Sequence, residues 1–293
     1  MSTIHFRIVA VLTVLVTFAP QTAAADSALK PYKNALFSEQ TVIESRDGGA
    51  LKVIDYQEMR DINGRDQIPE RRVKSAYVSL GVRRQQTDET VDLAGRKLEV
   101  TRVGVDLDSR FSVIFIHGRA GNRRLGSNDY TFGGNFNRLK NLAVANGGTY
   151  YVPSVRSFDA AGVADIAALI ADIARRSPGR PIVLSCASMG SFICWGISRD
   201  PAAVASLAGM GILGGATDPD YPKSAAFKAR LPLYFTHGGN DPVYAPADQI
   251  GLFESLLKSG YPARFTLYAG GNHGTAVRMT DWWDLLNWMI VRG

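Results

Sequence analysis

Residues 184–190 read Leu-Ser-Cys-Ala-Ser-Met-Gly, and this stretch decides the fold. An apolar run, residues 181–185, leads into it, and a helical pattern over residues 189–198 follows it. This order predicts that a buried strand turns sharply into a helix at Ser188. A serine in such a turn adopts a strained backbone conformation that exposes its hydroxyl. We therefore predict that Ser188 is a nucleophile; the alternative is that it only caps the helix.

The same alternation of strand and helix extends through the C-terminal two thirds of the chain. Apolar runs of strand length occupy residues 112–116, 149–152, 181–185, 207–213, 231–236 and 263–268. Helical periods occupy residues 160–176, 189–198, 247–259 and 280–291. This pattern predicts a three-layer α/β fold, in which a mostly parallel sheet carries helices on both faces. The working residues of such sheets gather beyond the carboxyl ends of the strands.

The N-terminal portion, residues 26–110, is richer in β-type patterns. Residues 51–56, 76–80 and 97–103 are β-branched or alternating runs, which predict antiparallel strands at the edge of the sheet. Between the first two runs, residues 58–74 are highly charged and contain Asn63-Gly64 and Pro69, so we expect an exposed loop. Residues 26–293 are expected to form one domain, because no linker or repeat interrupts them.

The first 25 residues are typical of a secretory signal. Arg7 precedes an apolar run over residues 8–19, and three alanines at 23–25 provide small residues for cleavage. The run is shorter than the roughly 20 residues that a membrane span needs. We expect cleavage after Ala25, a periplasmic or secreted protein, and no stable membrane span afterwards; an uncleaved anchor is the alternative.

Composition excludes several classes of protein. The chain has 293 residues, 46% of them hydrophobic, and a formal net charge of +6. A domain of this size buries enough surface to fold without a metal ion. The basic residues are spread along the chain, so we expect no nucleic-acid partner, and we predict no metal site and no cofactor. The sequence does not determine the oligomeric state.

The two cysteines flank the turn at Ser188. Strand rise and helix rise place Cys186 and Cys194 at similar depth below it. We expect two buried free thiols; a disulfide that joins the strand to its helix is the alternative, since export would permit it.

The turn around Ser188 resembles the G-x-S-x-G motif of the α/β-hydrolase family, with Cys186 in place of the first glycine. In that family the nucleophile, the acid and the histidine follow in this order. The resemblance implies that His273, in the glycine-rich loop 270–274, is the base. It implies that Asp241, which follows the strand before, is the acid that orients this base.

Three further aspartate and histidine positions remain open in the sequence. Asp218 and Asp220 are alternative acids, because some family members place the acid one strand earlier. His237, at the end of the strand before Asp241, is interpreted as a structural residue of the turn with a polar partner. Ser185 and Cys186 are alternative nucleophiles, but both precede the turn.

His117-Gly118 follows the first buried strand, where the family's oxyanion loop begins. The resemblance implies that the N–H of Arg119 joins that of Met189, at the start of the helix, to bind the oxyanion. We expect residues 119–135 to form a wall of the pocket. Arg123, Arg124 and Tyr130 in this wall are candidate substrate-binding residues for an anionic group; solvated surface charge is the alternative for the arginines.

Only residues 214–230 lie between the fourth and fifth apolar runs, too few for a lid of several helices. The resemblance therefore implies a lidless serine hydrolase, similar to small carboxylesterases and dienelactone hydrolases. We predict cleavage of a small-molecule or polymer-borne carboxylic ester. The alternatives are a peptidase or amidase, an acyltransferase with the same triad, and a catalytically silent binding protein with this fold.

Overall fold

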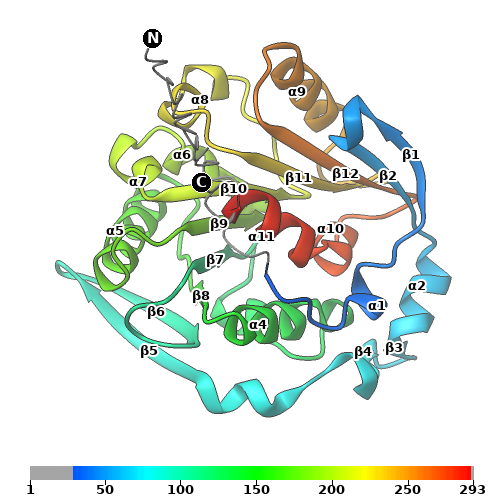
Figure 1. Cartoon of the computed structure of the whole chain (residues 1–293), viewed down its shortest axis with the longest axis horizontal. Helices are drawn as coiled ribbons and strands as arrows, with labels where there is room; N and C mark the ends of the chain where they lie inside the picture. The colour runs from blue at the N-terminus through cyan, green and yellow to red at the C-terminus, as the bar shows by residue number, and fades with distance from the viewer. Residues whose placement is uncertain (1–28, 292–293) are drawn as a thin grey trace, which may run out of the picture.

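The computed structural model describes residues 29–291, so the predicted signal peptide, residues 1–25, lies outside the described residues. In the described part, ten strands form one sheet in the order β1-β2-β12-β11-β10-β9-β7-β8-β6-β5 (Figure 1). Two short strands, β3 (Asp66–Gln67) and β4 (Arg72–Val73), form a separate hairpin. The strands of the large sheet are β1 (Val42–Arg46), β2 (Leu51–Asp55), β5 (Gln86–Leu93), β6 (Arg96–Val103), β7 (Ser112–Ile116), β8 (Thr149–Pro153), β9 (Ile182–Ala187), β10 (Leu207–Leu213), β11 (Leu233–Gly238) and β12 (Ala263–Ala269).

The centre of the sheet is parallel and its edges are antiparallel, as the sequence predicts. Strands β2, β12, β11, β10, β9, β7 and β8 run in the same direction. β1 pairs antiparallel with β2 at one edge, and β6 and β5 continue antiparallel beyond β8 at the other. Every residue of β7, β8 and β9 is buried, which explains their continuous apolar sequences. β2 differs from the prediction, because it pairs parallel with β12 and extends the central sheet.

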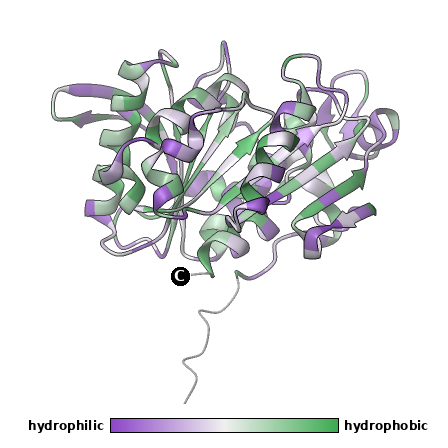
Figure 2. Cartoon of the chain, turned by 90° about the horizontal axis from the view of Figure 1, so that it is seen from above, coloured by the Kyte–Doolittle hydropathy of each residue, from purple (hydrophilic) through white to green (hydrophobic). Residues whose placement is uncertain are grey.

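Helices pack on both faces of this sheet (Figures 1 and 2). One apolar cluster joins the sheet to Ile166 of α5, Ile193 of α6 and Phe253 of α9. The other joins it to Phe136 of α4 and Leu286 of α11. The α-helices are α1 (Asn34–Phe37), α2 (Glu58–Arg65), α3 (Arg123–Gly126), α4 (Asn135–Ala145), α5 (Ala160–Arg176), α6 (Ser191–Ile197), α7 (Pro201–Ala205), α8 (Ala225–Lys228), α9 (Pro246–Lys258), α10 (Thr275–Met279) and α11 (Trp282–Ile290). The 3₁₀ turns are η1 (Asp47–Gly49), η2 (Ser75–Tyr77), η3 (Leu80–Gln85), η4 (Phe132–Gly134), η5 (Ser188–Gly190) and η6 (Tyr221–Lys223).

Two predictions for the N-terminal portion are wrong. Residues 76–80 form no strand; they lie in and between the 3₁₀ turns η2 and η3, where the chain crosses from the β2 edge to the β5 edge and has no strand to pair with. Residues 58–74 are mostly exposed, as expected, but they are not a loop, because they form α2 and the β3–β4 hairpin. Asp66 in this stretch is buried and accepts two hydrogen bonds from Arg278, 3.1 and 2.7 Å long. The charge of Arg278, 212 residues away in the sequence, offsets the cost of burying the Asp66 carboxylate.

Helix α4 was not foreseen from the sequence. Its polar residues Asn137, Arg138 and Lys140 are buried, so the apolar stripe on the helix is hidden among them. Arg138 donates to Asp281, and Lys140 lies 2.5 Å from Asp129, so both cations are neutralised by tertiary partners. Within residues 29–291, no helix has the length and apolar character needed to cross a membrane.

Candidate active site

Ser188 occupies the sharp turn between β9 and α6, as predicted. Its φ is +53°, in the left-handed region that few non-glycine residues adopt. A side chain at Gly118 would place its Cβ 2.8 Å from the Cβ of Ser188. One at Gly190 would lie 2.7 Å from the carbonyl oxygen of His117. Glycine at both positions therefore lets the loop after β7 close tightly on the serine turn.

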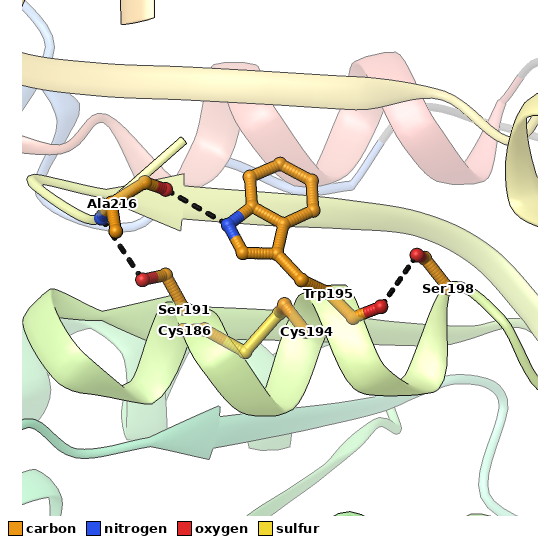
Figure 3. Close-up of a disulfide and its surroundings, with 6 residues drawn as sticks. All are labelled: Cys186, Ser191, Cys194, Trp195, Ser198 and Ala216. Carbon is orange, nitrogen blue, oxygen red and sulfur yellow. Dashed lines mark hydrogen bonds between the residues drawn. A yellow bond between two sulfur atoms is a disulfide. The ribbon is translucent and has the colours of Figure 1, made fainter. Parts of the chain in front are cut away.

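Cys186, where the family motif has glycine, is bonded to Cys194 of α6 (Figure 3). The prediction of two free thiols is therefore wrong. Strand β9 and helix α6 lie side by side, and the two Cα atoms are 6.2 Å apart, within the range that a disulfide spans. The side chain of Cys186 points into the contact between β9 and α6, where it forms the disulfide. The turn at Ser188 therefore keeps its shape although the family's first glycine is replaced.

Helix α6 is also fixed to the loop after β10 (Figure 3). The Nε1 atom of Trp195 donates to the carbonyl of Ala216 over 2.8 Å, and the N–H of Ala216 donates to Ser191 Oγ over 3.0 Å. These bonds and the disulfide hold the helix that follows Ser188 from two sides.

Three loops bring Ser188, His273 and Asp241 into one hydrogen-bonded chain. The distance from Ser188 Oγ to His273 Nε2 is 2.9 Å, and that from His273 Nδ1 to Asp241 Oδ2 is 2.8 Å. The other carboxylate oxygen, Oδ1, accepts the N–H groups of Val243 and Tyr244 over 2.8 and 3.3 Å. The Asp241 side chain is fully buried, and that of His273 is 28% exposed. A buried acid, a partly exposed imidazole and a hydroxyl are thus aligned for proton transfer.

The alternative site residues lie elsewhere. Asp218 pairs with Arg199 at 2.7 Å and Asp220 with Lys223 at 2.7 Å, so neither reaches His273. Ser185 is fully buried within β9. Cys186 has no free thiol.

His117 shapes the loop that carries Arg119. Its Nδ1 lies 2.8 Å from the Gly118 carbonyl, and its Nε2 accepts the N–H of Val155 over 3.0 Å. Because Nε2 accepts a hydrogen bond it carries no proton, so the ring is neutral and donates from Nδ1; burial, which lowers the pKa of His117, favours the same form. The Gly118 carbonyl is thereby turned toward the ring, and in a trans peptide the N–H of Arg119 points to the opposite side. Within residues 29–291 the backbone N–H of Arg119 has no protein acceptor, and that of Met189 lies in the first turn of η5, where a helix offers its N–H groups no internal partner.

A cavity of about 290 Å³ lies beside the His273 loop. Its walls come from α2, the β3–β4 hairpin, η4 and the His273 loop. They are Tyr56, Glu58, Ile62, Arg71, Thr131, Phe132, Asn272, Gly274, Thr275 and Arg278. A larger cavity, about 620 Å³, lies at the other end of the sheet and includes Pro181, Leu207 and Pro232, which precede or begin β9, β10 and β11. The size of that second cavity has no bearing on the Ser188 site.

The predicted substrate-binding residues, Arg123, Arg124 and Tyr130, do not contact the triad in this structure. Arg123 donates to the carbonyls of Glu89 and Val100 in the β5–β6 hairpin. The guanidinium of Arg72 lies over the ring of Tyr130, with its Cζ atom 3.4 Å from the ring centroid. Arg124 is exposed. The structure does not bring these three side chains into contact with the triad, and their role in binding substrate stays a prediction. The described residues contain no group of three or more His, Cys, Asp and Glu side chains suited to a metal ion.

His237 was predicted to be a structural residue of the turn with a polar partner, and its Nε2 lies 3.2 Å from Asp241 Oδ2, a partner that the prediction did not name. The carboxylate oxygen that orients His273 is therefore shared by two imidazoles. A histidine four residues before the predicted acid was the only signal in the sequence, and the distance across the loop could not be predicted from it.

No protein-family model matches the sequence, and no curated protein matches it. Solved structures do. A thermostable esterase superposes with a TM-score of 0.55 at 16% identity, covering 71% of this chain and 63% of that one. The chain has the α/β-hydrolase fold. Two further structures with this fold are a putative α/β hydrolase from Agrobacterium tumefaciens (TM-score 0.53, 16% identity, 69% of this chain and 93% of that one) and a lidless α/β serine hydrolase from Xanthomonas campestris (0.50, 16%, 71% and 94%).

The α/β-hydrolase fold of this chain has no large lid, as predicted. Between β10 and β11 only the short elements η6 and α8 intervene, and both pack on the body of the fold. At these identities the likeness establishes the fold, and the function has to be argued from the site.

Proposed function

We propose that the protein is an exported serine hydrolase that cleaves a carboxylic ester through an acyl-enzyme. One observation carries the proposal: the unbroken chain of hydrogen bonds from Ser188 through His273 to the buried Asp241. A serine that merely capped a helix would need neither a positive φ nor an imidazole on its hydroxyl. Similar solved structures that include esterases support the same class of reaction.

The geometry suits acyl transfer in two halves. Ser188 Oγ attacks the ester carbonyl carbon as its proton passes to His273 Nε2, and Asp241 stabilises the resulting imidazolium. The bond to the alcohol oxygen breaks, and His273 returns the proton to that oxygen. A water molecule then attacks the acyl-enzyme by the same route and releases the acid and Ser188. The free N–H groups of Met189 and Arg119 stabilise the oxyanion in each half; a single donor of this kind contributes about 3 kcal/mol.

The surroundings of His273 favour a compact substrate. The cavity beside its loop has a volume of about 290 Å³, room for roughly ten water molecules. Tyr56, Ile62 and Phe132 give it apolar walls. Glu58, Arg71 and Arg278 add charged groups to the same walls, so we expect a compact group of the ester with both apolar and polar atoms to bind there.

Export is supported by the signal-like residues 1–25 and by the disulfide between Cys186 and Cys194. Such bonds persist in oxidising compartments. Mass spectrometry of the protein recovered outside the cytoplasm should give Asp26 as its first residue. An intact N-terminus on protein recovered from the cytoplasm would contradict export.

The decisive experiment is covalent labelling. The mature protein should react with a fluorophosphonate probe and the Ser188→Ala variant should not, because the probe bonds only to an activated serine. A series of p-nitrophenyl esters of increasing acyl length should then show hydrolysis that declines as the acyl chain outgrows the site. Absence of labelling in the folded wild type would overturn the proposal, and a p-nitroanilide faster than its matched ester would replace the esterase with an amidase.

A further inference from the structure

The imidazole of His237 is fully buried at the end of β11 and meets three neighbours. Its Nδ1 lies 2.7 Å from the side-chain oxygen of Gln249, on α9. Its Nε2 lies 3.0 Å from the carbonyl oxygen of Tyr244 and 3.2 Å from Asp241 Oδ2. All three neighbours are oxygens.

The orientation of Gln249 is fixed by a second contact. Its side-chain nitrogen donates to the Gly215 carbonyl over 2.6 Å. Turning the amide around would set two oxygens against each other at that distance, so Gln249 presents an acceptor to His237. Nδ1 of His237 must therefore carry a proton.

Nε2 of His237 must carry a proton as well. A backbone carbonyl can only accept, and an ionised carboxylate can only accept. Asp241 is ionised, because its two oxygens receive donors from Val243, Tyr244 and His273. An unprotonated Nε2 would direct its lone pair at the oxygens of Tyr244 and Asp241. In a fully buried site this contact is repulsive, because bulk water cannot screen it.

The charge balance of the site leads to the same result. The carboxylate of Asp241 is fully buried, and a buried anion without a cation is strongly destabilising. His273 must be neutral before reaction, since it accepts the proton of Ser188. Of the other charged groups nearby, Asp218, after β10, pairs with Arg199, and the positive charge of Arg119 acts on the phenol of Tyr244, whose pKa it lowers against the effect of burial.

We propose that His237 is a buried imidazolium that binds Asp241 jointly with His273 and acts as a positioning residue for the catalytic acid. The permanent cation neutralises Asp241 in the resting site. It also reduces the net negative charge that Asp241 presents to His273. The hydrogen-bond argument for the protonation state of His237 does not depend on any activity, whereas the charge-balance argument and this catalytic consequence rest on the proposed function.

Nuclear magnetic resonance of the mature protein labelled with ¹⁵N-histidine tests the protonation state. The resonances that disappear in a His237→Gln variant belong to His237. At pH 7 both of its ring nitrogens should show the shifts of protonated nitrogen. A nitrogen of the unprotonated type at His237 would overturn the proposal, even if the protein proved to be an active esterase.

The pH profile tests the catalytic consequence. Gln at position 237 keeps a neutral donor near Nε2, so kcat/KM should fall by tenfold or less, through kcat and not KM. The midpoint of its acid limb should rise by about one pH unit, because Asp241 then acts on His273 alone. Gln249→Leu removes the acceptor of Nδ1, lets His237 become neutral, and should move the midpoint in the same direction.

A matched control is Gln40→Leu. Like Gln249, Gln40 donates its side-chain amide to backbone carbonyls, those of Phe37 and Met279, but it does not contact His237 or Asp241. This variant should lose stability and leave the acid limb in place. Acid limbs of the His237 and Gln249 variants that coincide with that of the wild type would contradict the proposed effect on catalysis. A wild type without esterase activity would defeat the proposed function and leave the NMR result standing.

Discussion

The central sheet and the N-terminal segment outside strands β1 and β2, residues 29–41 and 56–85, are held in place by different forces. Strands β7, β8 and β9 are wholly buried and make mainly apolar contacts. The N-terminal segment places Leu29 and Val82 in the apolar core and adds a set of buried polar contacts. Arg138 donates to Tyr32, Asn34 and Ser38 of the segment, and Arg278 binds Asp66. Apolar burial is non-directional, whereas each polar contact needs one particular partner.

The candidate site lies where these two regions meet. The triad comes entirely from loops of the central sheet. One side of the adjacent cavity belongs to the N-terminal segment, and the Asn272 side chain donates to Glu58 over 3.0 Å. We therefore expect changes in the core loops to remove activity, and changes at the polar fastenings to reduce stability while the remaining folded protein stays active.

The largest effect should come from Asp241→Asn. The amide oxygen can accept from Val243 and Tyr244, but the amide nitrogen then faces His273 and cannot accept its hydrogen bond, so kcat should fall roughly 10⁴-fold. Measurement of kcat on a p-nitrophenyl ester tests this. Asp220→Asn is the matched control, because Asp220 is 58% exposed and pairs only with Lys223. A comparable loss in both variants would show that Asp241 is not the acid.

The next effect concerns stability. Asp66→Asn removes one member of a buried charge pair and leaves Arg278 uncompensated, so the free energy of unfolding should fall by about 3–5 kcal/mol. Urea denaturation gives this value. The kcat of the folded fraction should stay within about threefold of the wild type. A fall in kcat as large as that of Asp241→Asn would remove the distinction between the two regions.

A smaller loss of stability is expected in the core. Replacing both Cys186 and Cys194 by alanine opens a short covalent loop, which should reduce the free energy of unfolding by roughly 2–3 kcal/mol. Ser191 and Trp195 still fix α6, so most esterase activity should remain. Denaturation of the variant beside the oxidised wild type measures the difference. Equal stability would mean that the disulfide adds nothing to the packing of β9 on α6.

The smallest effect is a pH dependence of stability at His117. Burial lowers its pKa from the ordinary value of 6.5, so the unfolded chain binds a proton below that pH that the folded protein does not. Stability should therefore fall as pH drops below about 6.5, by at most about 1.4 kcal/mol per pH unit. His117→Gln should flatten this slope in denaturation curves from pH 7 to pH 5. Parallel slopes in the two proteins would contradict the assignment.

The same contrast explains what could be predicted from the sequence. Continuous apolar runs and helical periods gave helix 160–176 with its observed bounds and placed all six strands of the C-terminal part. Ser188, Asp241 and His273, which follow β9, β11 and β12, were predicted as a triad because their order resembles that of the α/β-hydrolase family. In contrast, α2, the β3–β4 hairpin and α4 were missed or misread, because their buried residues include Arg65, Asp66 and Arg138.

The sequence by itself determined the fold class and the order of the three triad residues, since periodicity is local and parallel strands bring their carboxyl ends together. The tertiary structure alone decided three other features. It joined Cys186 to Cys194, fastened the N-terminal segment through charged partners, and placed His237 on Asp241. Each depends on the distance between groups that no local pattern encodes, and a charge or a thiol acquires its role only from the partner that the fold brings to it.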